Sequence, residues 1–255
     1  RINPTRGLNF DFNYTSSKLI SNGLGDQDSA GFFADSFNPF HTYGIDSSDR
    51  TNTFNATYNY NLPHTSGAGW LDRLTSGWYH SGIFTYASGA PLVVSMGGQV
   101  YGGGNLGLTN GADAIPTANA SQFLGNIGIF PNISSSGIAT RGNTSAGGLG
   151  LNVFTDPAGA FNSFRTIQLA SDGRSGNANP LRGFGSWNWN GALGKSTAIT
   201  EKLNLAYSLQ VFNVLNHPFW NDPRLGLFGT SPASFGVLTG KNGNRTMEMG
   251  LRLEF

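Results

Sequence analysis

The amino-acid sequence predicts an all-β protein: an antiparallel transmembrane β-barrel segment, about six to eight strands of a larger barrel, with long extracellular loops. Three observations predict this fold. Apolar and polar residues alternate over six segments, long and short connections alternate between these segments, and charged residues are scarce. A period of two places neighbouring side chains on opposite faces of a strand, so each segment has one apolar and one polar face.

The first three strands are predicted over residues 8–15, 54–62 and 78–86, with apolar faces of Leu8, Phe10, Phe12 and Tyr14, then Phe54, Ala56, Tyr58, Tyr60 and Leu62, then Trp78, His80, Gly82, Phe84 and Tyr86. The last three are predicted over residues 187–193, 203–211 and 247–255, with apolar faces of Trp187, Trp189, Gly191 and Leu193, then Leu203, Leu205, Tyr207, Leu209 and Val211, then Met247, Met249, Leu251, Leu253 and Phe255. None of these apolar positions carries a formal charge, and many are aromatic. Aromatic belts opposite a polar lumen are typical of transmembrane barrels, whereas the inner face of a sandwich favours Val, Ile and Leu.

The connections between the predicted strands alternate in length. They cover residues 16–49, 63–76, 88–186, 196–202 and 212–244, which are in turn long, short, long, short and long. Transmembrane barrels have short periplasmic turns and long extracellular loops, so this order is expected if the last strand ends in the periplasm. The central connection is unusually long for a compact domain, so it needs either substructure of its own or a special setting, and an extracellular barrel loop is such a setting.

The composition excludes several classes of protein. Only 11% of the 255 residues are charged, against about 25% in an average soluble domain, and the net charge is +1 with no basic stripe. We therefore expect no nucleic-acid partner. Cys is absent, which excludes disulfides and thiolate metal sites. No apolar run is long enough for a transmembrane helix, and no signal peptide is visible.

The final residues carry a more specific motif. Glu248, Gly250, Leu253 and Phe255 match a pattern of a polar residue, Gly, an apolar residue and a terminal aromatic residue. This pattern resembles the assembly signal of bacterial outer-membrane proteins. The resemblance implies localisation in the bacterial outer membrane, with membrane lipid and the barrel-assembly machinery as partners.

A wider resemblance is carried by four stretches: Asp49-Arg50-Thr51, Ser76 to Pro91, Asn179 to Gly183 with Trp187 to Asn190, and Ile199 to Lys202 with Val211 to Pro218. Their Gly-Trp strand, Ser-Gly-x-Pro turn, Arg-Gly segment and Phe-Asn-x-x-Asn-His-Pro ending resemble the TonB-dependent outer-membrane receptors. The similarity is to the Oar-like group, which has a carboxypeptidase-regulatory-like N-terminal domain. His80 departs from the pattern, because an apolar residue is expected there.

The resemblance implies a barrel of about 22 strands filled by an N-terminal plug. It implies TonB-dependent uptake of a scarce nutrient, such as a glycan fragment or a chelated metal, with TonB as a partner acting through the plug. Six predicted strands are too few to close a membrane barrel, because single-chain barrels start at about eight. We therefore expect residues 1–255 to be the C-terminal portion of a larger receptor, with the plug domain absent from this chain.

The candidate binding residues lie at inward-facing positions of the predicted strands: Asp11, Asn55, Asn59, Gln210 and Arg252. They either contact solute or plug, or simply hydrate the lumen; the sequence favours the second reading and does not identify the small-molecule substrate. The loop aromatics Tyr43, Tyr101, Phe219 and Trp220 either stack on a substrate or pack the loops together.

No cofactor, metal site or enzymatic activity is expected. His41, His64, His80 and His217 lack the spacing of a zinc site, and the glycines of residues 102–107 lack the Lys-Ser/Thr end of a phosphate loop. Asp26 with Asp28, and Asp46 with Asp49, could bind Ca²⁺ but fit turn caps better. No Gly-x-Ser-x-Gly elbow occurs. Two other functions remain open, a secreted β-sandwich that binds carbohydrate or mediates adhesion, and a passive porin.

Overall fold

The computed structural model describes residues 2–5, 7–21, 44–63, 69–95, 114–124, 127–134, 137–139, 150–165, 181–227 and 230–255. Its main element is a seven-stranded sheet with the strand order β1-β2-β5-β6-β14-β15-β18. The strands are β1 (Ile2–Thr5), β2 (Leu8–Ser16), β5 (Asn52–Asn61), β6 (Trp78–Ala87), β14 (Ser186–Thr200), β15 (Leu203–Phe212) and β18 (Thr246–Glu254). All neighbouring pairs are antiparallel, so the sheet is a meander.

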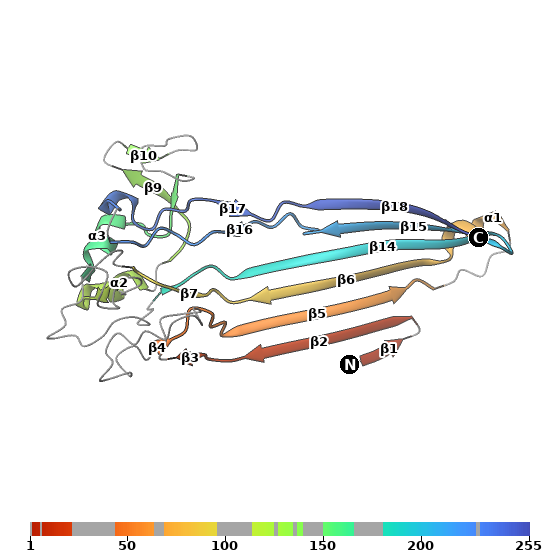
Figure 1. Cartoon of the computed structure of the whole chain (residues 1–255), viewed down its shortest axis with the longest axis horizontal. Coiled ribbons are helices and arrows are strands. Elements are labelled where there is room, and N and C mark those ends of the chain that lie inside the picture. Colours follow the sequence, from red (N-terminus) through yellow and green to blue (C-terminus); the bar gives the residue numbers. More distant parts are fainter. Residues whose placement is uncertain are drawn as a thin grey trace, which may run out of the picture.

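Figure 1 shows the long connections gathered at one end of this sheet and the short connections, with the C-terminus, at the other. These ends are called the loop end and the turn end below. The alternation of long and short connections is therefore confirmed, and so are all six predicted strands. The structure adds β1, which has four residues and is too short to show a clear alternation.

One connection is shorter than predicted. Strand β14 has 15 residues and continues through the segment expected to be the turn at residues 196–202. Ser196 pairs with Ala206 and Thr197 with Leu205, so the actual turn consists of Glu201 and Lys202. The small side chains from Ser196 to Ala198 hide the apolar-polar contrast that marks the other strands.

The register of the sheet joins the predicted faces into two continuous surfaces, because residues directly opposite each other lie on the same face. One row of partners is Asn9, Asn59, Ser81, Ala192, Gln210 and Glu248. The next row is Phe10, Tyr58, Gly82, Gly191, Val211 and Met247. We call the face that carries the first row the polar face, and the face that carries the second row the apolar face.

Aromatic contacts cross the apolar face from strand to strand. Phe12 packs edge-on against Phe54, Phe54 against Phe84, and Phe84 stacks on Trp187, with ring centroids 4.5, 5.7 and 6.0 Å apart. Even so, the face is largely uncovered: Met249 is 77% exposed and Leu251 71%. The other sheets of the described residues have two or three strands and lie in the long connections. A sandwich would need a second sheet packed over this face, so the arrangement does not support that alternative.

The longer β14 also adds a charged residue to the apolar face, beyond the positions of the predicted strand. Lys195 lies on this face at the turn end, directly opposite Trp78. Its Nζ atom lies 5.0 Å from the centroid of the Trp78 ring. Lysine tolerates such a position because its long stem follows apolar surface while its ammonium group reaches a polar partner.

The long connections form small elements of their own. Strands β3 (Ile20–Ser21) and β4 (Gly44–Ile45) pair with each other, as do β7 (Pro91–Leu92) and β13 (Leu181–Arg182), β8 (Ile115–Pro116) and β12 (Phe164–Arg165), and β16 (Phe219–Trp220) and β17 (Lys241–Asn242). Strand β9 (Phe130–Ser134) pairs with β10 (Gly137–Ala139) and β11 (Leu151–Asn152). The helices are α2 (Ser121–Leu124), α3 (Pro157–Asn162) and the 3₁₀ segments η2 (Ala118–Ala120) and η4 (Pro232–Ser234), while α1 (Trp70–Thr75) lies in the turn between β5 and β6.

The hydrophobic core of the described residues lies in these connections and not in the sheet. Phe154 stacks on Phe235 at a centroid distance of 5.6 Å, and both side chains are almost fully buried. The rings of Phe161 and Phe164 also pack against the Phe235 ring. This cluster joins the connection after β6 to the connection after β15 and forms what is called the loop cap below. No helix of the described residues is long and apolar enough to cross a membrane.

Candidate functional site

The register places all five candidate binding residues on the polar face. Asp11 comes from β2, Asn55 and Asn59 from β5, Gln210 from β15 and Arg252 from β18. They do not converge on one point. Asp11, Asn59 and Gln210 line a first cavity, Asn55 lines a second, and Arg252 lines neither of these two.

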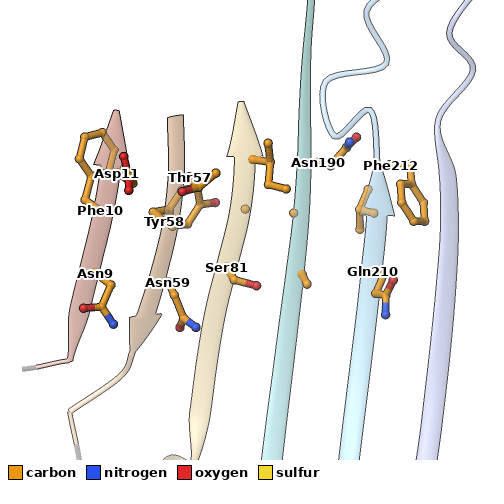
Figure 2. A pocket seen from close by; sticks show the side chains of 15 residues that line it. Asn9, Phe10, Asp11, Thr57, Tyr58, Asn59, Ser81, Asn190, Gln210 and Phe212 are labelled. Atoms are coloured by element: carbon orange, nitrogen blue, oxygen red, sulfur yellow. The ribbon is translucent and has the colours of Figure 1, made fainter. Parts of the chain in front are cut away.

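The first cavity has a volume of about 470 Å³ and spans five neighbouring strands. Asp11 is its one charged lining residue, and the other polar side chains are Asn9, Thr57, Asn59, Ser81, Asn190 and Gln210. Figure 2 shows these side chains on a single face of the sheet. The hollow lies on the polar face, so this face is concave. A barrel with a polar lumen curves in this direction.

The second cavity lies on the same face, nearer the loop end, and also measures about 470 Å³. Asn55, Thr85 and Asn188 line it together with Phe219 from the connection after β15. Asn188 donates from Nδ2 to Oδ1 of Asn190 at 3.0 Å, while its own buried Oδ1 atom has no hydrogen-bond partner among the described residues. Of the loop aromatics, Phe219 therefore reaches a cavity of the polar face, whereas Trp220 packs against the loop cap.

The Phe-Asn-x-x-Asn-His-Pro segment is the anchor of the third long connection. Asn213 is buried and has a φ of 54°, a left-handed conformation that asparagine tolerates better than most residues. Its Oδ1 atom accepts from the His217 amide at 2.9 Å, and its Nδ2 group donates to the carbonyls of His217 and Gly243. Its own amide donates to Oδ1 of Asn190 at 2.9 Å, which connects the anchor to the polar face.

A second anchor joins the first two long connections. The Asp49 carboxylate is fully buried and accepts from the Leu19 amide at 2.6 Å. It also pairs with Arg182, whose Nη1 group donates to the Gly89 carbonyl at 3.4 Å. Burial acts to raise the pKa of Asp49, but the Leu19 hydrogen bond and the Arg182 guanidinium outweigh burial and hold this pKa below its ordinary value of 3.8.

These two anchors were not predicted as contacts. Asp49 and Arg182 belong to stretches that carried the family resemblance, yet nothing in the local sequence shows that they meet. Asp46 was expected to cap a turn, and it does: its Oδ1 atom accepts a hydrogen bond from the Ser48 amide at 2.9 Å. Asp49 was expected to do the same, but its carboxylate forms an ion pair with the Arg182 guanidinium.

The histidines that the structure describes have structural contacts. His80 Nε2 lies 3.5 Å from the Tyr58 hydroxyl on the apolar face, and the His217 ring stacks on Trp187 at 4.0 Å between centroids. Within the described residues, no three His, Cys, Asp or Glu side chains are grouped to hold a metal ion. Several candidate residues lie outside the described part of the chain: Asp26, Asp28, His41, Tyr43, His64, Tyr101 and the glycines of residues 102–107.

The four residues of the assembly motif are divided between the faces of β18. Glu248 pairs with Gln210 and Gly250 with Ser208 on the polar face, whereas Leu253 pairs with Leu205 on the apolar face. Phe255 follows the end of the strand and is fully exposed. Among the described residues β18 pairs only with β15, so its other edge is available to a partner strand.

Comparison with known protein families agrees with this geometry. Comparisons with curated proteins and with solved structures give no match. A family model described as an outer membrane beta barrel domain matches residues 1–248, which is nearly the whole chain. The match ends at Glu248, so it does not bear on the rest of the assembly motif. The curved sheet, its polar concave face and its bare apolar face are those of a membrane barrel wall, and the chain belongs to the outer membrane β-barrel domain family of the bacterial outer membrane.

Proposed function

We propose that this chain is the C-terminal wall of a TonB-dependent receptor that takes up a scarce nutrient, such as a glycan fragment or a chelated metal. Membership of the family supports a transporter or receptor role in general terms. The observation that favours a receptor is the loop cap, which has a buried aromatic core. A receptor needs an ordered surface outside the barrel to recognise its substrate, whereas a passive porin needs an open mouth.

The anchors support the same proposal. The Asp49–Arg182 pair and the Asn213 turn tie the bases of the long connections to each other and to the polar face. Neither described cavity is lined by a histidine, and their amide and hydroxyl side chains suit solute or plug contacts better than catalysis. We therefore propose transport, with no enzymatic step in this chain.

The open edges of the sheet support the proposal that the complete receptor is larger. Among the described residues β1 and β18 each pair on one side only. An open edge cannot face lipid, because its backbone groups would lack hydrogen-bond partners. The sheet has seven strands, whereas the smallest single-chain barrels have about eight. Further strands of the same polypeptide, preceded by a plug, would close the barrel.

The test compares the full-length protein in cells with and without a functional TonB. Uptake of labelled oligosaccharides and ferric siderophores is measured in both strains, with the gene deleted as the baseline. We expect uptake of one class to disappear with TonB or with a protonophore. The purified protein is also placed in planar bilayers, where a plugged receptor passes little current. Steady conductance together with TonB-independent uptake would instead identify a passive porin.

A further inference from the structure

The turn between β5 and β6 carries two exposed apolar side chains on a short helix. Helix α1 lies at the turn end of the sheet (Figure 1). Trp70 is 70% exposed and Leu74 is 56% exposed. Residues four apart lie on the same face of a helix, so the two side chains form one apolar patch. A turn that faced only water would leave this patch uncovered.

The end of α1 is fastened to the apolar face of the sheet. Trp78 Nε1 donates to the Leu74 carbonyl at 2.9 Å. Lys195 Nζ donates to the Leu74 carbonyl at 2.8 Å and to the Ser76 carbonyl at 2.6 Å. The carbonyl groups at the end of a helix lack hydrogen-bond donors within the helix. Here the Trp78 and Lys195 side chains provide these donors. Trp78 and Lys195 are opposite each other on the apolar face, which places the end of α1 on the lipid side of the wall.

The chemistry of this attachment indicates its depth in the membrane. Short turns of a bacterial barrel are periplasmic, so α1 lies at the periplasmic side. Trp is enriched at the level of the lipid headgroups, and Lys reaches toward that level from apolar surface. The Trp78–Lys195 pair therefore marks the periplasmic headgroup layer, and Leu74 is bound to both of its members.

We propose that α1 is an interfacial anchor that inserts Trp70 and Leu74 into the phospholipid of the periplasmic leaflet. The end of α1 is hydrogen-bonded to Trp78 and Lys195 of the apolar face, and this face contacts lipid because the chain is the wall of an outer-membrane barrel. This attachment to the lipid-facing side of the wall favours lipid as the occupant over a periplasmic protein. An amphipathic segment of this kind is held by the apolar area it buries at the boundary between headgroups and acyl chains. The anchor does not depend on TonB-dependent uptake.

Spin labelling of the full-length protein tests this proposal. The chain contains no cysteine, so Trp70→Cys and Leu74→Cys each create a single labelling site within it. The matched control is Glu201→Cys in the exposed turn between β14 and β15. Each labelled protein is reconstituted in phosphatidylethanolamine–phosphatidylglycerol vesicles. The collision rates of the nitroxide with apolar oxygen and with a water-soluble nickel chelate are then measured.

We expect the ratio of oxygen to nickel collisions to be several-fold higher at positions 70 and 74 than at position 201. Ratios equal to that of the control would show that α1 faces water and would overturn the proposal. Low collision rates with both reagents would show that protein covers the patch and would overturn it as well. Heat-modifiable migration on gels confirms that each variant is folded before the measurement.

Discussion

Arg182 and Asp49 form an ion pair between two long connections of the barrel, with 2.7 Å between Arg182 Nη2 and Asp49 Oδ2. The Asp49 side chain is completely buried, whereas that of Arg182 is 37% exposed. Beside the pair, Gly89 lies so close to the Gly183 carbonyl that a side chain added at Gly89 would collide with it. The pair therefore fixes where the first and second connections leave the strands, below the loop cap.

Breaking this pair should loosen the first connection without unfolding the sheet. In Arg182→Met the Asp49 carboxylate stays buried but loses its cation, which costs about 3 kcal/mol when one partner of a buried pair is removed. We expect hydrogen exchange of the Leu19 and Gly183 amides to accelerate strongly, since both belong to this anchor. Arg224→Met, at an exposed position of the third connection, is the control and should leave these amides protected. Equal protection in both variants would contradict the assigned role.

The same pair should make the anchor sensitive to acid. The pKa of Asp49 is lowered in the folded state, so its contribution to stability is complete above the ordinary value of 3.8. This contribution is lost as the pH falls through the lower folded pKa. We expect protection of the Leu19 amide to drop in that acidic range in the wild type, and Asp49→Asn to remove the pH-dependent step. Asp46→Asn, which changes a neighbouring turn cap, should retain it.

The strands could be predicted from the sequence because each face of the sheet meets a single environment. The apolar face meets lipid, and the polar face meets the aqueous lumen. That constraint produces strict alternation, and where the alternation weakens the prediction weakens too, as at β1 and at Ser196 to Ala198. The anchors and the loop cap could not be predicted, because they depend on side chains far apart in the chain. Phe154 meets Phe235 and Asp49 meets Arg182 only once the sheet has brought three connections together.

The assignment of the two faces is tested by adding a charge at neighbouring positions of β15. Leu209 lies on the apolar face and Gln210 on the polar face. Leu209→Arg should destabilise the folded barrel by about 2–4 kcal/mol if the position lies near the middle of the bilayer. Gln210→Arg should be nearly neutral, because the lumen is hydrated. The folded fraction in lipid vesicles at increasing urea concentration measures both. A larger effect at Gln210 would reverse the assigned faces.

The turn before β6 depends on the backbone of Gly77. Its φ is +76°, and an added side chain would collide with the Ser196 carbonyl. The Ser196 amide also donates to the Gly77 carbonyl at 3.1 Å, so the two strands cannot separate without losing this bond. Gly77→Ala should cost more than about 1 kcal/mol. Gly69→Ala is the matched control, since Gly69 has a φ of +100° but open space around it. Urea unfolding should show the smaller loss for Gly69→Ala, and equal losses would mean that backbone strain alone matters.

Phe255 should act on assembly and not on the stability of the finished barrel. Its side chain is fully exposed and follows the last residue of β18, so deletion removes no packing within the described structure. If the terminal aromatic residue is part of the assembly signal, its deletion should slow insertion into the outer membrane and lower the yield of folded protein. Protein that does insert should unfold at the same urea concentration as the wild type. Phe255→Tyr keeps an aromatic ring and should insert at the normal rate. Normal insertion after deletion, measured by pulse-chase and heat-modifiable migration, would show that assembly does not depend on Phe255.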